Sequence, residues 1–143
     1  MNEFDIVSEW LHIAYNDYDS AKFLYEKKLP KPLEIICYHC QQSAEKSLKA
    51  YLCANDVDIP KTHEVSRLCN QCIDLNSSFT VFFDDCVELE VYATETRYPI
   101  RIDIDDTHAE RALRQAWNIY EFVSKIIYQM INSGNDASSC QEK

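Results

Sequence analysis

A stripe of polar side chains has the residue types of a site for an anion or a nucleobase. His39, Gln42, Lys46 and Lys49 recur at steps of three and four residues, with Glu45 at the border. That spacing places them on one face of a helix. There a Lys provides a point charge for a phosphate, and the amide both donates and accepts hydrogen bonds. The stripe predicts a ligand site, with a solvated helix face, the commoner case, as the alternative.

A second candidate lies where a helical pattern ends, in the segment Tyr92 to Pro99. Arg97 precedes Tyr98 and Pro99, so an aromatic ring and a rigid residue would hold the guanidinium in place. A guanidinium held in this way suits a phosphate, because its planar fork donates two parallel hydrogen bonds. The alternative is an Arg that caps the last carbonyls of the helix.

The cysteines have the spacing of a zinc site, but we expect no metal. Cys37 and Cys40 form one Cys-x-x-Cys pair, and Cys69 and Cys72 form another. Both pairs fall inside predicted helices, without the Gly or Pro of a zinc-knuckle turn, and buried Cys behaves as a small hydrophobic side chain. We predict that no metal or other cofactor is bound.

The elements that must position these residues are helices. Apolar periodicity predicts them over residues 5–28, 33–55, 63–75, 79–96 and 107–131. Four are long and one is short, which favours an all-α fold, an antiparallel four-helix up-and-down bundle with the short helix packed across one end. The predicted inward stripe of the first helix consists of Ile6, Trp10, Ile13, Ala14, Asp17, Ala21 and Leu24.

The predicted ends of these helices rest on capping residues. We expect Thr62 to be the N-cap of the third helix and Asn76 to Ser78 to cap the fourth. Thr107 to Glu110 has the form of a capping box for the last helix. Asn132-Ser133-Gly134 is expected to end that helix. The predicted division is one helical domain over residues 1–131 and a flexible tail over residues 132–143.

The bulk properties limit the possible partners. The chain has 143 residues and a net charge of −10, with 46% hydrophobic residues and a single Gly. So acidic a chain is poorly suited to broad binding of nucleic acid or of an anionic membrane, and any nucleotide or RNA must occupy a confined site. The N-terminal segment does not resemble a signal peptide, no apolar run could span a membrane, and the seven Cys suit a reducing compartment. We therefore expect a cytoplasmic protein.

Three stretches together resemble the HEPN domain (higher eukaryotes and prokaryotes nucleotide-binding). Residues 38–50 are similar to the second helix of that family, and residues 60–63 and 97–99 follow in the order and spacing that the family shows. The resemblance covers about residues 5 to 130. It implies an antiparallel helical bundle, frequent dimerisation, and a functional site near the dimer interface.

The resemblance implies a nucleotide-binding protein that is also a possible helical partner of a nucleotidyltransferase-like protein. The residues expected to line the nucleotide site are His39, Gln42, Lys46, Arg97 and Tyr98.

The alternative is a metal-independent endoribonuclease toxin of a toxin–antitoxin pair. Family RNases resemble one another in an Arg followed, after four to six residues, by a His. Arg97 has no such His, whereas Arg101 and His108 satisfy the spacing within an acidic loop. These two residues are the predicted catalytic pair of the RNase hypothesis.

Apolar residues beside the main stripes are consistent with a homodimer, which we predict. They are Tyr18, Tyr25, Ile119, Phe122 and Ile126. A wide intramolecular core stripe would give the same pattern and is the alternative.

Overall fold

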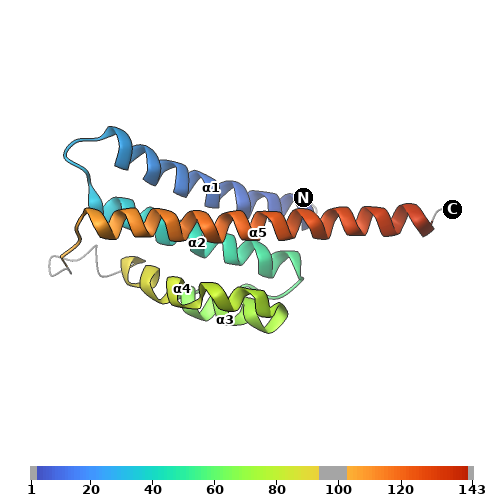
Figure 1. Ribbon diagram of the computed structural model, residues 1–143. Coiled ribbons are helices and arrows are strands. Elements are labelled where there is room, and N and C mark those ends of the chain that lie inside the picture. The colour runs from blue at the N-terminus through green and yellow to red at the C-terminus, as the bar shows by residue number, and fades with distance from the viewer. Residues whose placement is uncertain (1–2, 94–102, 142–143) are drawn as a thin grey trace.

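A computed structural model describes residues 3–93 and 103–141, and the side chains of residues 4–93 and 103–134. Within these ranges the chain is helical and contains no strand (Figure 1). The elements are α1 (Glu3–Lys27), α2 (Leu33–Ala54), α3 (Val65–Leu75), the 3-10 helix η1 (Ser77–Phe82), α4 (Phe83–Glu90), the 3-10 turn η2 (Val91–Ala93) and α5 (Asp106–Gln141). The predicted all-α fold class is confirmed.

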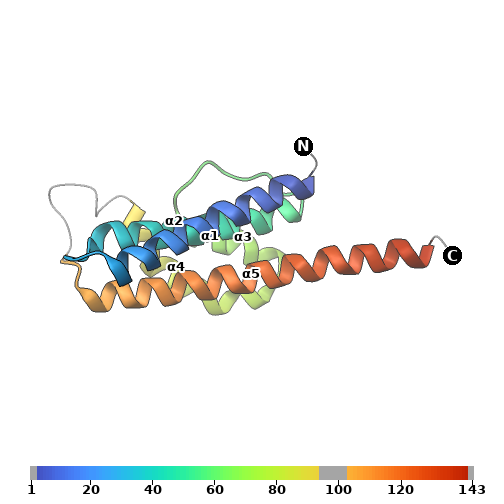
Figure 2. The ribbon, with the colours of Figure 1, turned by 90° about the horizontal axis from the view of Figure 1, so that it is seen from above.

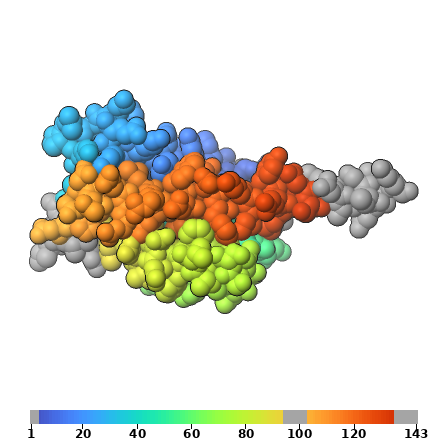
Figure 3. Space-filling view, viewed as in Figure 1, coloured from blue at the N-terminus to red at the C-terminus, as the bar shows by residue number. Residues whose placement is uncertain are grey.

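Helix α2 is the central element of the fold. It packs against α1, α3 and α5, and its neighbours enclose even its polar residues Gln41, Ser43, Glu45 and Ser47. Figure 1 and Figure 2 show α1 and α5 running along α2. In Figure 3 the side chains of α5 cover the surface between α1 and the pair formed by α3 and α4. A polar residue in α2 is therefore placed inside the molecule rather than on a solvated face.

Polar contacts fix the register between α1 and α2. The Ser43 hydroxyl donates to the Ala14 carbonyl at 2.7 Å, and His39 pairs with Asp17 at 3.0 Å. Residues later in α2 thus lie beside residues earlier in α1, so the two helices are antiparallel. The small residues Ala14 and Ala21 are fully buried in α1, which lets the two backbones approach closely.

The predicted inward stripe of α1 is partly wrong. Ala14 and Ala21 are fully buried as predicted, but Ile6 and Ile13 are each 40% exposed, and Val7, which was not predicted, completes the buried line. The small buried residues of α1 recur every seven positions. Their larger neighbours therefore lie at the edge of the interface with α2. The two isoleucines are thus left on the outer surface of α1.

The short helix α3 does not lie across one end of the bundle as predicted. It lies beside α4 and against α2 (Figure 1). Phe79 of η1 connects this layer to the core: its ring stacks on Tyr51 with centroids 4.6 Å apart and meets Phe122 of α5 edge-on at 5.0 Å. Both neighbours belong to the long helices, so this layer is part of the main core.

The predicted helix over residues 79–96 is not one α-helix. Its described part consists of η1, α4 and η2, and residues 94–96 lie outside the described residues. The Asn76 side chain accepts a hydrogen bond from the Ser78 N–H at 3.0 Å, which confirms its predicted capping role. Thr80 donates to the Ser77 carbonyl at 2.6 Å. Such side-chain bonds compete with the α-helical pattern, and they accompany a tighter first turn.

Two predicted N-caps are replaced by other residues. α3 begins at Val65, and Glu64 is its N-cap. The Thr62 hydroxyl instead accepts a hydrogen bond from the Glu64 N–H, before the helix begins. α5 begins at Asp106, and Asp105 accepts from the His108 N–H at 3.0 Å. The carboxylate of Asp105, not Thr107, therefore satisfies a free N–H of the first turn.

The predicted end of the last helix at residues 132–134 is also wrong, because α5 continues to Gln141. A single Gly costs a helix only about 1 kcal/mol relative to Ala, so Gly134 need not end it. Flexibility of residues 132–143 stays a prediction. In the described part of the chain, no helix combines the length and the apolarity needed to cross a membrane.

Candidate functional site

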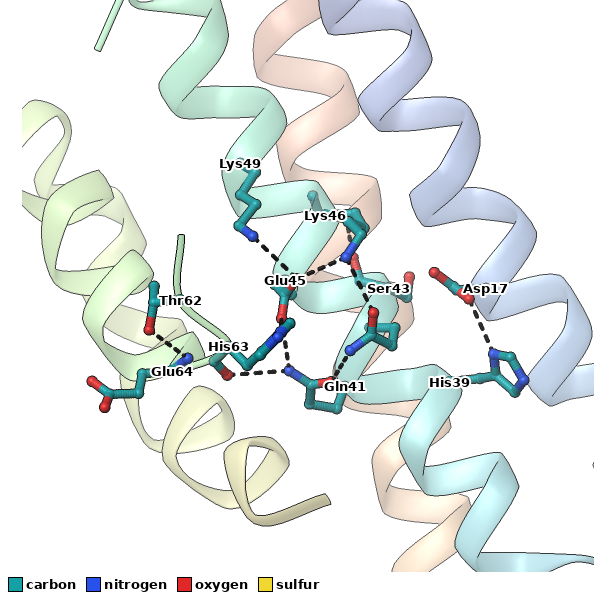
Figure 4. A network of polar contacts seen from close by, with 12 residues as sticks. Asp17, His39, Gln41, Ser43, Glu45, Lys46, Lys49, Thr62, His63 and Glu64 are labelled. Carbon is teal, nitrogen blue, oxygen red and sulfur yellow. Dashed lines mark hydrogen bonds and ion pairs between the residues drawn. The ribbon is translucent and has the colours of Figure 1, made fainter. Parts of the chain in front are cut away.

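The most unusual side chain of the described residues is Glu45, whose carboxylate is 0% exposed. Its Oε2 lies 2.7 Å from Lys46 Nζ and 3.2 Å from Lys49 Nζ. Its Oε1 lies 2.8 Å from His63 Nδ1 and 3.2 Å from Gln41 Nε2 (Figure 4). The four-residue spacing of Gln41, Glu45 and Lys49 places them on one face of α2. A buried carboxylate with four donors is fully satisfied.

These residues, together with Gln42, form what we call the Glu45 cluster: Gln41, Gln42, Glu45, Lys46, Lys49 and His63. The Gln42 amide donates to Gln41 Oε1 at 2.7 Å and accepts from Lys46 Nζ at 3.1 Å. Gln41 also donates to the His63 carbonyl at 3.3 Å. The cluster therefore ties the loop before α3 to the middle of α2.

The donors of the cluster hold Glu45 in its ionised form. Burial alone would raise the pKa of this carboxyl, but the hydrogen bonds from Lys46 and His63 and the charges of Lys46 and Lys49 outweigh it, and the pKa is lowered. Two ammonium groups thus surround one carboxylate, which leaves an excess of one positive charge. His63 adds another when it is protonated.

Part of this positive group is accessible from outside. His63 is 69% exposed in its side chain, and its Nδ1 proton is committed to Glu45, so Nε2 is the nitrogen left for other partners. Lys46 is 19% exposed. It donates to Glu45 and Gln42, and an ammonium group has three donors. The outer side of the cluster can therefore bind an anion without breaking its internal contacts.

The structure brings together some of the predicted site residues and separates one. Gln42, Lys46 and Lys49 all belong to the Glu45 cluster. His39 turns toward α1, where its Nδ1 lies 3.0 Å from Asp17 Oδ1 (Figure 4). Arg97 and Tyr98 lie outside the described residues, so their part in the site stays a prediction.

Of the predicted catalytic pair, Arg101 and His108, the structure describes His108 alone. Arg101 lies outside the described residues. His108 lies in the first turn of α5, with Nδ1 2.9 Å from Asp105 Oδ1. The hydrogen bond from the His108 backbone N–H is the main cause of a lowered pKa at Asp105. His108 thus takes part in the cap of α5, and its catalytic role stays a prediction.

Sequence reasoning missed the centre of the cluster. Glu45 was placed only at the border of the polar stripe, and Gln41 and His63 were given no role in the site. The four-residue spacing of Gln41, Glu45 and Lys49 was a usable signal for a contact between them. His63 had no such signal, because it reaches Glu45 from a loop 18 residues further along the chain.

The paired cysteines have the surroundings of core side chains. Cys37, Cys40, Cys69 and Cys72 are fully buried, and burial raises the pKa of Cys37 to about 12, so this thiol stays protonated rather than becoming a thiolate ligand. Cys72 lies 3.7 Å from the Leu48 carbonyl. Among the described residues there is no group of three or more His, Cys, Asp or Glu that could hold a metal ion.

The residues that suggested a homodimer pack within the chain. Ile119 is fully buried, Phe122 meets Phe79 and Phe82, and Ile126 lies against the core. Tyr18 packs on Trp117 at 5.1 Å. Tyr25 donates to Asp106 at 2.7 Å. The wide core stripe is therefore the correct interpretation of these residues, and the homodimer needs other support.

The fold and the cluster define a small all-helical domain built around a buried carboxylate in its second helix. A sequence model of the HEPN domain matches residues 7–127, and the chain belongs to the HEPN domain family.

Two solved structures show the same fold. The crystal structure of ST0689, an archaeal HEPN homologue, matches with a TM-score of 0.66 and 22% identity, over 85% of this chain and 97% of that chain. The crystal structure of TT1696 from Thermus thermophilus matches with a TM-score of 0.70 and 23% identity, over 87% of this chain and 98% of that chain. At such identities the likeness concerns the fold alone. No curated protein matches the chain.

Proposed function

We propose that this HEPN domain protein binds nucleotides, and that their phosphate groups contact the outer side of the Glu45 cluster. The observation that carries the proposal is the excess of positive charge around Glu45, whose carboxylate lies 2.7 Å from one Lys and 3.2 Å from another. Lys46 and His63 are the members that a phosphate could reach. Gln42, already bonded to Lys46, would hold that ammonium in position.

The negative charge of the whole chain limits which anions can approach the positive charge around Glu45. At a net charge of −10, most of the surface repels a polyanion. A small cationic site with fixed donors still suits a compact phosphate group, because Coulomb attraction over a few ångströms outweighs the more distant, screened charges. The proposal is therefore a confined nucleotide site rather than a broad nucleic-acid surface.

Arg97 and Tyr98 complete the proposed site. The family resemblance suggests both residues for the site, where Arg97 would donate to phosphate and Tyr98 would stack on the base. His39 belongs to the same sequence-based prediction. Its pairing with Asp17 places it on the α1 side of α2, away from the cluster.

The test is thermal unfolding with millimolar ATP or GTP, because a ligand that binds the folded state must raise the apparent stability. We expect a rise in Tm for the wild type, and about a tenfold loss of affinity in Lys46→Gln, in line with one charge-assisted hydrogen bond. Lys125→Gln is the matched control, since Lys125 forms an exposed pair with Glu121 on α5. Absence of stabilisation by any nucleotide, or equal losses in the two variants, would contradict the proposal.

A second candidate function is that of the helical partner of a nucleotidyltransferase-like protein. The observation that favours a protein partner is the outer face of η1 and α4. Val81 is 74% and Val87 43% exposed there, beside exposed Asp84 and Glu88. Apolar side chains among carboxylates suit a partner surface that is apolar and basic.

Calorimetric titration with a purified nucleotidyltransferase-like protein, chosen from the same genome, would test the partnership. We expect Val87→Lys to weaken the complex at least tenfold, since it places a charge at an apolar contact and repels a basic surface. The control is Lys125→Glu on α5. Equal affinity of Val87→Lys and the wild type would rule out this face.

A further inference from the structure

A shallow groove lies along one exposed face of α1, near its N-terminal end. Ile6, Glu9, Trp10 and Ile13 line it. The two isoleucines are each 40% exposed, and the buried line of α1 runs through Val7 and Ala14 instead. The groove thus has apolar and aromatic walls and one carboxylate; its two isoleucines are exposed, whereas Trp10 is partly buried against the core.

The groove adjoins the Glu45 cluster through Trp10. Lys49 Nζ lies 5.8 Å from the centroid of the Trp10 ring, within the range of a cation–π contact, and the same Nζ lies 3.2 Å from Glu45. The Ser43–Ala14 hydrogen bond fixes the register of the two helices at this point. The Trp10 ring is therefore connected to the cluster through Lys49.

We propose that this groove is the nucleobase subsite of the nucleotide site. The inference rests on the proposed function and adds to it the residues that would contact the base. The base stacks on the indole of Trp10 between Ile6 and Ile13, and the phosphates lie on Lys46 and His63. Stacking on an aromatic side chain accepts any base, since every base has a π-face.

Glu9 gives the groove a preference among bases. Its carboxylate only accepts hydrogen bonds when ionised, so it suits a base that carries an exocyclic amine. Adenine, guanine and cytosine have such a donor, whereas uracil does not. The expected ligand class is thus a nucleotide with an amine-bearing base.

Calorimetric titration of the full chain with ATP, UTP and inorganic tripolyphosphate separates the two parts of the site. Stacking of one base is worth a factor of roughly 5 to 150 in affinity. We expect ATP to bind about tenfold or more tightly than tripolyphosphate, and more tightly than UTP. Trp10→Leu should lower the affinity for ATP to that for tripolyphosphate, and leave tripolyphosphate itself unchanged.

Two further variants and one control sharpen the test. Trp10→Phe keeps an aromatic face, so it should keep most of the preference for ATP over tripolyphosphate even if Trp10→Leu unfolds. Glu9→Ala should remove the preference for ATP over UTP. Trp117→Leu, in α5 and outside the groove lining, should leave both ratios unchanged.

The outcomes distinguish failure of the subsite from failure of the proposed function. If ATP and tripolyphosphate bind equally, the groove is not a base subsite, although the cluster still binds phosphate. If neither binds, the proposed function itself fails. If Trp10→Leu changes the sedimentation mass but not the ratio of affinities, the groove is a protein interface, and the inference is overturned.

Discussion

Glu45 shows how one residue can organise a site without being exposed. Taking a carboxylate out of water costs several kcal/mol, and only close donors offset that cost. Glu45 has four such donors at 2.7–3.2 Å. The same contacts hold two ammonium groups and an imidazole together, although like charges would otherwise separate. The carboxylate is therefore a positioning residue for the cationic group.

Removing the charge of Glu45 should destabilise the protein. In Glu45→Gln, Lys46 and Lys49 lose their counter-charge while they remain largely buried, so we expect the free energy of unfolding to fall by about 3 kcal/mol. Urea denaturation measures the change. The matched control is Glu121→Gln, which breaks an exposed pair with Lys125 and should cost under about 0.5 kcal/mol. Equal losses in the two variants would contradict a structural role for the buried carboxylate.

The same residue gives a pH dependence with a defined sign. The pKa of Glu45 in the folded protein lies below its ordinary value of 4.5, so its contribution is fully present above about pH 4.5 and is lost as the pH falls through the folded-state pKa. The difference in unfolding free energy between wild type and Glu45→Gln should therefore be large at pH 7 and shrink in more acidic solution. Urea denaturation of both proteins across that range checks this. A constant difference would show that Glu45 does not titrate as described.

At the scale of the elements, apolar periodicity predicted the bounds of α1, α2 and α3 well, but it missed the C-terminal end of α5 and the break in the helix after Asn76. The observed α1, α2 and α3 agree within about two residues with the predictions, because each has a regular apolar repeat. The segment after Asn76 is different. The side chains of Asn76 and Thr80 bind the Ser78 N–H and the Ser77 carbonyl there, and side-chain periodicity does not report such local competition.

The candidate site was predictable to a similar degree. Gln42, Lys46 and Lys49 follow from helical spacing, and all three belong to the observed cluster. The burial of Glu45 does not follow, because α2 has polar residues on a face that other elements cover. His63 was missed because it joins the cluster from a loop, and the position of a loop depends on tertiary packing.

Asn76 is expected to stabilise the turn that begins η1. Its side chain accepts from the Ser78 N–H at 3.0 Å, and loss of such a cap typically costs about 1 kcal/mol. Asn76→Ala should lower the unfolding free energy by that amount in urea denaturation, and Asn76→Asp should restore most of it. Ser77→Ala is the control and should stay within about 0.5 kcal/mol of the wild type. Equal stability of Asn76→Ala and wild type would show that the cap is not needed.

At the scale of the whole molecule, the net charge of −10 controls how the chain meets its partners. The charge repels a second copy of the same chain and attracts a basic partner. The homodimer stays a prediction, based on the family resemblance after the residues first chosen for it proved to pack internally. One surface still suits self-association, the aromatic group formed by Tyr15 of α1, which is 41% exposed, and Tyr120 of α5.

A homodimer of so acidic a chain should strengthen with salt. The screening length falls from about 30 Å at 0.01 M to about 3 Å at 1 M ionic strength, so the repulsion between two copies decreases while apolar contacts persist. We expect the dimer dissociation constant from sedimentation equilibrium to fall as salt is raised. Tyr15→Lys, compared with Phe23→Lys as an exposed control further along α1, tests whether the aromatic group forms the interface. A basic protein partner would show the opposite salt dependence, and a chain that stays monomeric at every salt concentration would contradict the homodimer.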